Sequence, residues 1–240
     1  MQHLGVRGAI GSGNGTTADT VGGAEEATAR PEFLGRNLRS HRYVLKLAMD
    51  RVFSALVLLI VALPMLVLAV LIKLDSPGPV LYRQVRIGRG GRGFDMYKFR
   101  SMFDGAEEHH EALAISVGQN KSPIFKLRQD PRVTRLGKVI RRTSLDELPQ
   151  LFNVLRGDMS LVGPRPALPR ELESYKPWQR ARLEAVPGMT GLWQVSGRSE
   201  LSFQEMSRLD LEYIEQWSLW LDCWALLRTI PAVVTGRGAF

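Results

Sequence analysis

Two adjacent carboxylates, Asp146 and Glu147, lie in the stretch RRTSLDELPQ. A carboxylate can act as a nucleophile or as a ligand for a divalent cation. The same pattern also fits a helix start, because Ser144 and Glu147 have the spacing of a capping box and Asp146 could itself be an N-cap. Pro149 is tolerated in a first helical turn. Taken alone, this stretch leaves chemistry and capping both open.

The residues that follow the two carboxylates predict a short helix and a rigid turn. Four apolar residues at helical spacing form one face, and these are Leu148, Leu151, Phe152 and Leu155. Gly157 then ends the helix and begins GDMSLVGPRP, in which Arg165 stands between two prolines. The sequence therefore predicts that the acidic pair, Asp146 and Glu147, lies at a helix start and is faced by an arginine-bearing turn.

Composition limits the classes of function. The 240 residues are 45% hydrophobic, which allows one large domain or one domain with appendages. The formal net charge is +8, so nucleic acid, anionic lipid and phosphorylated substrates are all candidate partners. Cys223 is the single cysteine, which excludes an intramolecular disulfide framework and a cysteine-rich metal site and favours a location that faces the cytosol.

The N-terminal part of the chain predicts a leader and a membrane segment. Residues 1–40 are rich in Gly, Thr and Ala and are predicted to be a disordered leader. Within the segment 41–75, a run of about 20 apolar residues is long enough to span a bilayer. Pro64 interrupts this run, and both flanks are basic, which favours a re-entrant helix that returns to the cytoplasmic side. A proline-kinked span and a buried core helix are the alternatives.

The segment 76–240 is predicted to be the catalytic domain, and it begins with a hairpin. VLYRQVRIG and FDMYKFRSM flank RGGRG, which is typical of two strands and a turn. The glycines could instead cradle a phosphate, although P-loop spacing is absent. Lys98 and Arg100 alternate with Tyr97 and Phe99, so we expect the two basic residues to share one strand face, either solvated or directed at a substrate.

Two further stretches carry candidate functional residues. VPGMTGLWQVSGRSE, residues 186–200, predicts a glycine-rich loop that delivers Gln194 and Arg198, and such loops bring amides and a cation to phosphates. Residues 203–228 have a helical pattern rich in aromatic side chains. These aromatic residues either pack against the core or lie at the bilayer surface.

From Lys46 to the C-terminus the chain resembles the bacterial monotopic phosphoglycosyl transferases. The motifs that carry the resemblance are KFRSM, RRTSLDELPQLFNVLRGDMSLVGPRP and PGMTGLWQVSGR, which follow a proline-broken apolar helix and an SPGP turn. The resemblance implies an enzyme on the cytoplasmic face of the bacterial inner membrane. It would transfer a phospho-sugar from a UDP-sugar, with glucose or galactose as the leading candidates, to polyprenol (undecaprenyl) phosphate, releasing UMP at the first membrane step of exopolysaccharide or related glycan synthesis.

The resemblance also implies roles for single residues. Asp146 would be the nucleophile that forms an aspartyl phospho-sugar intermediate, and Asp146 with Glu147 would hold Mg²⁺. Glu147 would otherwise position the metal or relay a proton. The residues expected to contact phosphate or substrate are Lys98, Arg141, Arg165, Arg198 and Gln194, while Asp158 could instead brace its turn. Leu63 departs from the family pattern, in which a serine precedes the helix-breaking proline.

The expected fold is a mostly helical α/β catalytic domain with a short antiparallel strand element, a re-entrant membrane helix kinked at Pro64, and interfacial amphipathic helices. Expected partners are a UDP-sugar, polyprenol phosphate and membrane lipid, and a homo-oligomer is left open. A nucleic-acid binder has no use for the apolar run. A non-catalytic membrane scaffold would be indifferent to Asp146→Asn, and a conventional glycosyltransferase would release UDP.

Overall fold

The computed structural model describes residues 40–109, 129–197 and 201–234, together with Leu38, Leu113, Ile115, Ser116 and Leu127. The elements in this part of the chain are α3 (His41–Asp75), β1 (Leu81–Ile87), η1 (Arg89–Gly91), β2 (Gly93–Phe99), α5 (Arg135–Arg142), η2 (Leu145–Glu147), α6 (Gln150–Arg156), β3 (Ser160–Val162), η3 (Pro169–Ser174), η4 (Pro177–Glu184), β4 (Gly188–Thr190), α7 (Leu192–Ser196), α8 (Phe203–Gln216) and α9 (Leu219–Val234). The domain is mostly helical, as the sequence predicts.

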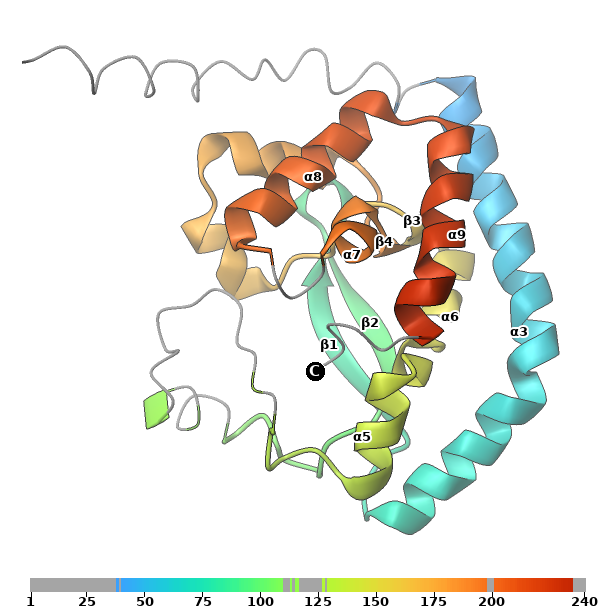
Figure 1. Ribbon diagram of the computed structural model, residues 1–240, viewed down its shortest axis with the longest axis vertical. Helices are drawn as coiled ribbons and strands as arrows, with labels where there is room; N and C mark the ends of the chain where they lie inside the picture. The colour runs from blue at the N-terminus through green and yellow to red at the C-terminus, as the bar shows by residue number, and fades with distance from the viewer. Residues whose placement is uncertain are drawn as a thin grey trace, which may run out of the picture.

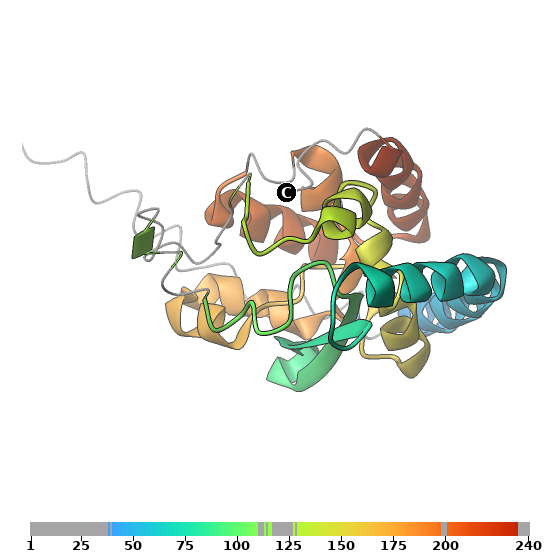
Figure 2. The same ribbon diagram turned by 90° about the horizontal axis from the view of Figure 1, so that it is seen from below.

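Helix α3 lies along one outer edge of the molecule (Figures 1 and 2). Ser40 caps its start by accepting a hydrogen bond from the Tyr43 amide, and the helix continues through Pro64 to Asp75. Only 11% of its most apolar 18-residue stretch is buried, whereas the core helix of a soluble protein is mostly buried. It is the one helix in the described ranges that is long and apolar enough to cross a membrane.

A buried ionic cluster attaches the first half of α3 to the rest of the domain. The Lys46 ammonium lies 2.9 Å from a carboxylate oxygen of Asp50 and 3.3 Å from one of Asp222 on α9. It also donates to the Ser160 hydroxyl on β3 at 2.5 Å. Tyr213 and Trp217 donate to the two oxygens of Asp222. We call Lys46, Asp50, Ser160 and Asp222 the Lys46 cluster.

The C-terminal end of α3 is held by Arg100, which corrects the prediction that Arg100 shares a strand face with Lys98. Strand β2 ends at Phe99, and the buried Arg100 guanidinium donates to the carbonyl oxygens of Ser76 and Pro77 at 2.6 and 2.8 Å. Carbonyl groups at a helix C-terminus lack intrahelical partners and attract cations, so Arg100 satisfies them. The residue is therefore neither solvated nor directed at a substrate.

The predicted hairpin is present. Strands β1 and β2 pair antiparallel, with Tyr82 opposite Lys98 and Arg86 opposite Phe94. Gly90 and Gly91 have φ values of 69° and 77° in the connection, a left-handed conformation that glycine adopts without steric cost. These glycines therefore make the turn, as the simpler of the two interpretations predicts.

A second, parallel pair of short strands, β3 and β4, was not predicted. It crosses the core where Gly163 meets the backbone of residues 186–188, and a Cβ on Gly163 would lie 2.6 Å from the Val186 carbonyl oxygen. Strand β4 and helix α7 occupy most of the described part of 186–200, so the prediction of a glycine-rich loop there is wrong. Glycine serves close backbone packing at this place.

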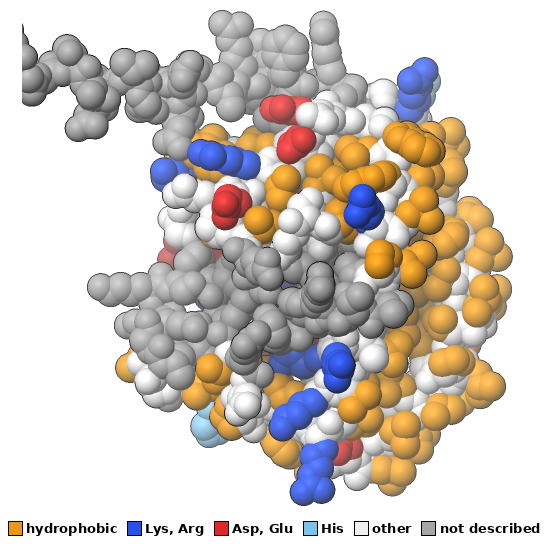
Figure 3. Space-filling model, viewed as in Figure 1, with side chains coloured by type: hydrophobic (Ala, Val, Ile, Leu, Met, Phe, Trp, Pro, Cys, Tyr) orange, Lys and Arg blue, Asp and Glu red, His pale blue; other side chains and the backbone are white. Residues whose placement is uncertain are grey.

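The helical pattern predicted for 203–228 forms two helices, α8 and α9. Ser202 and Glu205 make a capping box at the start of α8, and the chain leaves helical geometry at Trp217. Trp217 is buried, whereas Trp220 is 78% exposed. Trp217 therefore packs in the core, one of the two roles that the sequence left open for these aromatic residues, whereas Trp220 lies at the protein surface. Figure 3 shows apolar side chains gathered along the edge formed by α3.

Candidate active site

The acidic pair lies in the short 3-10 helix η2 between α5 and α6. Ser144 precedes it with φ 56° and ψ 17°, and it is the only non-glycine residue with positive φ in the described ranges. The Ser144 side chain makes no capping hydrogen bond, and Asp146 lies inside η2, so the capping interpretation is wrong. A left-handed serine costs free energy, and such strain is concentrated at functional sites.

Asn153 fixes the hairpin against the helix that follows the acidic pair. Its fully buried amide accepts from the Tyr97 backbone N–H at 3.0 Å and donates to the Asp95 carbonyl oxygen at 2.7 Å. Both groups belong to the outer edge of β2, so the Asn153 side chain on α6 makes hydrogen bonds there that a third strand would otherwise make. The consequence is that Lys98, on the same strand, is held beside the acidic pair.

Asp146 has charged neighbours of both signs, the negative Glu147 and the positive Lys98 and Arg141. The Lys98 ammonium lies 2.7 Å from a Glu147 carboxylate oxygen, and Asp146 is 9% exposed. Burial raises the pKa of Asp146 to about 6, with Glu147 adding to the shift, while Lys98 and Arg141 oppose it. Asp146 is thus a buried carboxyl that ionises within reach of two cations, which is the setting of a reactive group.

The structure brings together four of the predicted site residues, Lys98, Arg141, Asp146 and Glu147. Gln194 is engaged elsewhere, because its amide donates to the Met189 carbonyl oxygen at 2.8 Å.

Asp158 follows Gly157, which ends α6 with φ 86°. Its backbone N–H donates to the Asn153 carbonyl oxygen, and its carboxylate lies 3.5 Å from the Asn153 amide. These contacts brace the turn. Arg198 lies outside the described residues.

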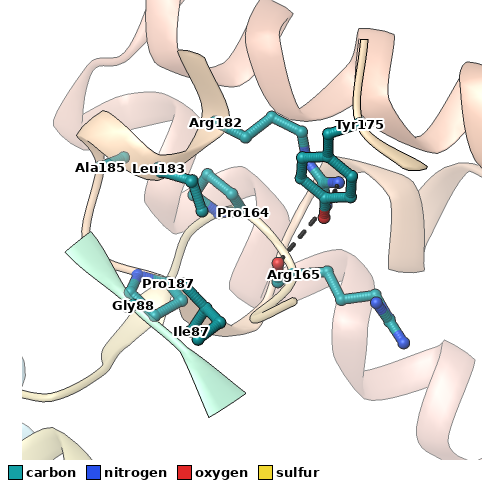
Figure 4. Close-up of a pocket in the computed structure, with 9 residues that line it drawn as sticks. All are labelled: Ile87, Gly88, Pro164, Arg165, Tyr175, Arg182, Leu183, Ala185 and Pro187. Atoms are coloured by element: carbon teal, nitrogen blue, oxygen red, sulfur yellow. Dashed lines mark hydrogen bonds between the residues drawn. The ribbon is translucent and has the colours of Figure 1, made fainter. Parts of the chain in front are cut away.

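Arg165 forms a two-point ion pair with the buried Glu171, at 2.8 and 3.1 Å. It borders a small pocket that is lined by Ile87, Gly88, Pro164, Arg165, Tyr175, Arg182, Leu183, Ala185 and Pro187. Figure 4 shows the Arg165 guanidinium extending away from Pro164 and Pro187. Arg182, also in the pocket wall, pairs with the buried Asp210. Both arginines of the pocket therefore already have carboxylate partners.

Sequence reasoning missed Asn153, Glu171 and Arg86 as parts of this region. Glu171 follows Arg165 by six residues, but nothing in the sequence marks it as buried. Asn153 stands on the predicted helix among apolar residues, and a polar residue in such a place is a signal that could have been used.

The donor set fits a magnesium ion. Mg²⁺ is usually held by one or two carboxylates together with substrate phosphates, and Asp146 and Glu147 supply two adjacent carboxylates. The described residues contain no group of three or more His, Cys, Asp or Glu side chains arranged to hold a metal.

The chain belongs to the bacterial sugar transferase family, whose model matches residues 41–236. Among its relatives is the undecaprenyl-phosphate galactose phosphotransferase of Salmonella typhimurium, 44% identical over 205 residues, which are 84% of this chain and 43% of that protein. The UDP-glucose:undecaprenyl-phosphate glucose-1-phosphate transferase of Caulobacter vibrioides is 43% identical over 203 residues, 81% of this chain and 72% of that protein.

A shorter relative is the exopolysaccharide production protein ExoY of Rhizobium meliloti, which is 40% identical over 198 residues. The match covers 81% of this chain and 88% of ExoY. Of several longer relatives the chain covers less than half, as with 36% of the galactosyl transferase CpsE of Streptococcus agalactiae. This chain therefore corresponds to nearly all of ExoY and to one part of the longer proteins.

Proposed function

We propose that the protein transfers a hexose-1-phosphate, glucose or galactose, from a UDP-sugar to undecaprenyl phosphate and releases UMP. The observation that carries this proposal is the buried Asp146 beside the Lys98–Glu147 ion pair, in a chain whose relatives carry names of such transferases. A carboxylate that attacks a diphosphate needs cations to cancel the repulsion, and Lys98 and Arg141 are in place to do so.

The chemistry has two displacements. An oxygen of ionised Asp146 attacks the sugar-bearing phosphorus, and the bond from this phosphorus to the bridging oxygen breaks, so that UMP leaves with the electron pair. The undecaprenyl phosphate oxygen then attacks the same phosphorus and frees the Asp146 carboxylate. Mg²⁺ held by Asp146 and Glu147 would supply positive charge to the phosphates. Lys98 orients Glu147 through their 2.7 Å ion pair.

The membrane placement is part of the proposal. The large apolar residues of α3 are exposed on one face over its whole length, from Val44 to Leu74. We propose that this face enters the cytoplasmic leaflet of the bacterial inner membrane and that both flanks remain on the cytoplasmic side. Cysteines introduced by Arg42→Cys and Arg92→Cys, each in a Cys223→Ser background, should then react with an impermeant thiol reagent from the same side. Labelling from opposite sides would establish a spanning helix.

Nucleotide release by the purified protein in lipid nanodiscs tests the activity. With Mg²⁺, a UDP-sugar and undecaprenyl phosphate we expect continuous UMP release, and without the lipid we expect a burst of at most one UMP per protein. Asp146→Asn should reduce turnover by about 1,000-fold or more, because the nucleophile is lost. Asp95→Asn, a matched change on the exposed surface of β2, should retain activity.

The other outcomes identify the rival functions. UDP release would indicate a conventional glycosyltransferase. No turnover with any UDP-sugar would favour a membrane scaffold, and unchanged turnover in Asp146→Asn would overturn the covalent mechanism.

A further inference from the structure

Arg86 lies on the face of the hairpin that carries Lys98. Tyr82 pairs with Lys98 and Arg86 pairs with Phe94, so Tyr82, Arg86 and Lys98 point to the same side of the two strands. That side meets the acidic pair, because Lys98 binds Glu147 there. Lys98 lies opposite Tyr82, which is four residues from Arg86 along β1, so the backbones of Lys98 and Arg86 are about 13 Å apart. Two long side chains that extend toward each other can span this distance.

The hydrogen-bond partners of Arg86 are neutral. Its Nε and Nη2 atoms donate to the Gln84 side-chain oxygen at 3.0 and 2.6 Å, and Nη1 donates to the Pro166 carbonyl oxygen at 3.1 Å. These bonds use three of the five N–H donors of a guanidinium. In the described ranges no carboxylate lies within ion-pair distance of Arg86.

Arg86 differs in this respect from the other arginines nearby. Arg165 is matched by Glu171 and Arg182 by Asp210. Burial, together with the neighbouring Arg165 charge, lowers the pKa of Arg86 to about 9, and Glu171 and Glu147 only partly oppose the shift. A desolvated cation without a counter-charge is costly, and it is retained where an anion binds.

Gln84 and Pro166 also fix the direction of the guanidinium. Gln84 bonds two of its nitrogen atoms from one side, and Pro166 belongs to the rigid turn that carries Arg165. The hairpin itself is attached to this turn by the Ile87 amide, which donates to the Ala167 carbonyl oxygen at 2.8 Å. The two remaining N–H donors are therefore held in place before any ligand arrives, which lowers the entropy cost of binding a phosphate.

We propose that Arg86 binds the phosphate of the UMP portion of the sugar donor and that Gln84 positions it. This inference rests on the proposed function, in which the sugar-bearing phosphate lies at Asp146 and the second phosphate is adjacent to it. When the bond between the two phosphates breaks, negative charge develops on the departing UMP phosphate. Lys98 and Arg141 are engaged near Asp146, whereas the Arg86 charge is free of any carboxylate in the described residues and is available to the leaving group.

The test compares Arg86→Gln with Arg83→Gln, which removes the same charge from the opposite, exposed face of β1. We measure UMP affinity by isothermal titration to the protein in nanodiscs, without undecaprenyl phosphate. A charge-assisted hydrogen bond to phosphate corresponds to about a 10- to 100-fold effect, so Arg86→Gln should weaken UMP binding by that factor. Arg83→Gln should bind UMP as the wild type does, and Arg86→Lys should be intermediate.

Steady-state kinetics distinguish an effect on binding of the nucleotide from an effect on binding of the lipid phosphate. Arg86→Gln should raise the KM for the UDP-sugar and leave the KM for undecaprenyl phosphate unchanged. Wild-type UMP affinity in Arg86→Gln, or a change confined to the lipid KM, would overturn the inference. So would a loss of UMP binding that accompanies a fall in Tm absent from Arg83→Gln, because Arg86 would then be structural. A wild type that binds UMP but never releases it from any UDP-sugar would instead reject the proposed function.

Discussion

The Lys46 cluster and the acidic pair both contain buried carboxylates, but the protein surrounds these carboxylates with different partners. In the Lys46 cluster one ammonium lies within 3.3 Å of two carboxylates and also donates to Ser160. Asp222 receives further hydrogen bonds from Tyr213 and Trp217. Burial raises the pKa of both Asp222 and Asp146, the latter to about 6, but Asp222 is paired with Lys46 and hydrogen-bonded by Tyr213 and Trp217. The first arrangement joins α3 to β3 and α9, while the second places the proposed nucleophile Asp146 near two cations.

The largest effect is expected from breaking the Lys46 cluster. Lys46→Met leaves two buried carboxylates without their cation, which should lower the free energy of unfolding by about 3–5 kcal/mol. Chemical denaturation in detergent measures the change. Lys73→Met is the matched control on the same helix, because Lys73 is exposed and should have little effect. Equal losses in the two variants would show that the cluster does not stabilise the attachment of α3.

Removing the charge of Asp146 should change the free energy of unfolding in the opposite direction to Lys46→Met. Because the folded-state pKa of Asp146 is raised to about 6, folding disfavours the ionised form, and stability falls as pH rises from about 4 to about 6. Asp146→Asn removes the buried charge, so it should raise the free energy of unfolding at pH 7.5 by about 1–3 kcal/mol. At pH 4 the variant and the wild type should converge. A destabilised variant at pH 7.5 would place Asp146 with the well-paired charges.

The same pKa predicts a pH dependence of the chemistry. In the proposed mechanism only ionised Asp146 attacks phosphorus, so the UMP burst should slow as pH falls below the pKa of Asp146, which is about 6 in the metal-free protein. The burst without undecaprenyl phosphate is the measurement of choice, since the lipid phosphate cannot then titrate in the same range. A burst rate that does not fall at low pH would contradict attack by an ionised Asp146 carboxylate.

The smallest effect on folding is expected at Trp220, on the helix that also carries Asp222. Trp220 is 78% exposed, so Trp220→Phe should change the free energy of unfolding by less than about 0.5 kcal/mol. If this face meets lipid, the variant should lose part of the fluorescence quenching that acyl-brominated lipids produce. Trp178→Phe, on η4, serves as the control, and equal quenching in Trp220→Phe and the wild type would place the face away from lipid.

Local sequence was sufficient for the features that depend on neighbours in the chain. The hairpin follows from alternating strand residues around glycines, and the end of α6 follows from Gly157. The predicted membrane segment covers the same residues as α3, because an apolar run is a property of the sequence itself. Motifs also marked Asp146 and Glu147 as candidates for chemistry.

Tertiary structure decided which charges are matched. Nothing local to Arg165 or Arg86 shows that the first faces Glu171 and that the second hydrogen-bonds only neutral groups. Lys46 has Asp50 as a local partner four residues away on α3, but its second carboxylate, Asp222, comes from α9. Burial and pairing depend on residues up to 176 positions apart, from Lys46 to Asp222. The sequence alone thus determines which residues can ionise. The fold decides which of them lose their water and which find a partner, because both desolvation and Coulomb attraction act through space.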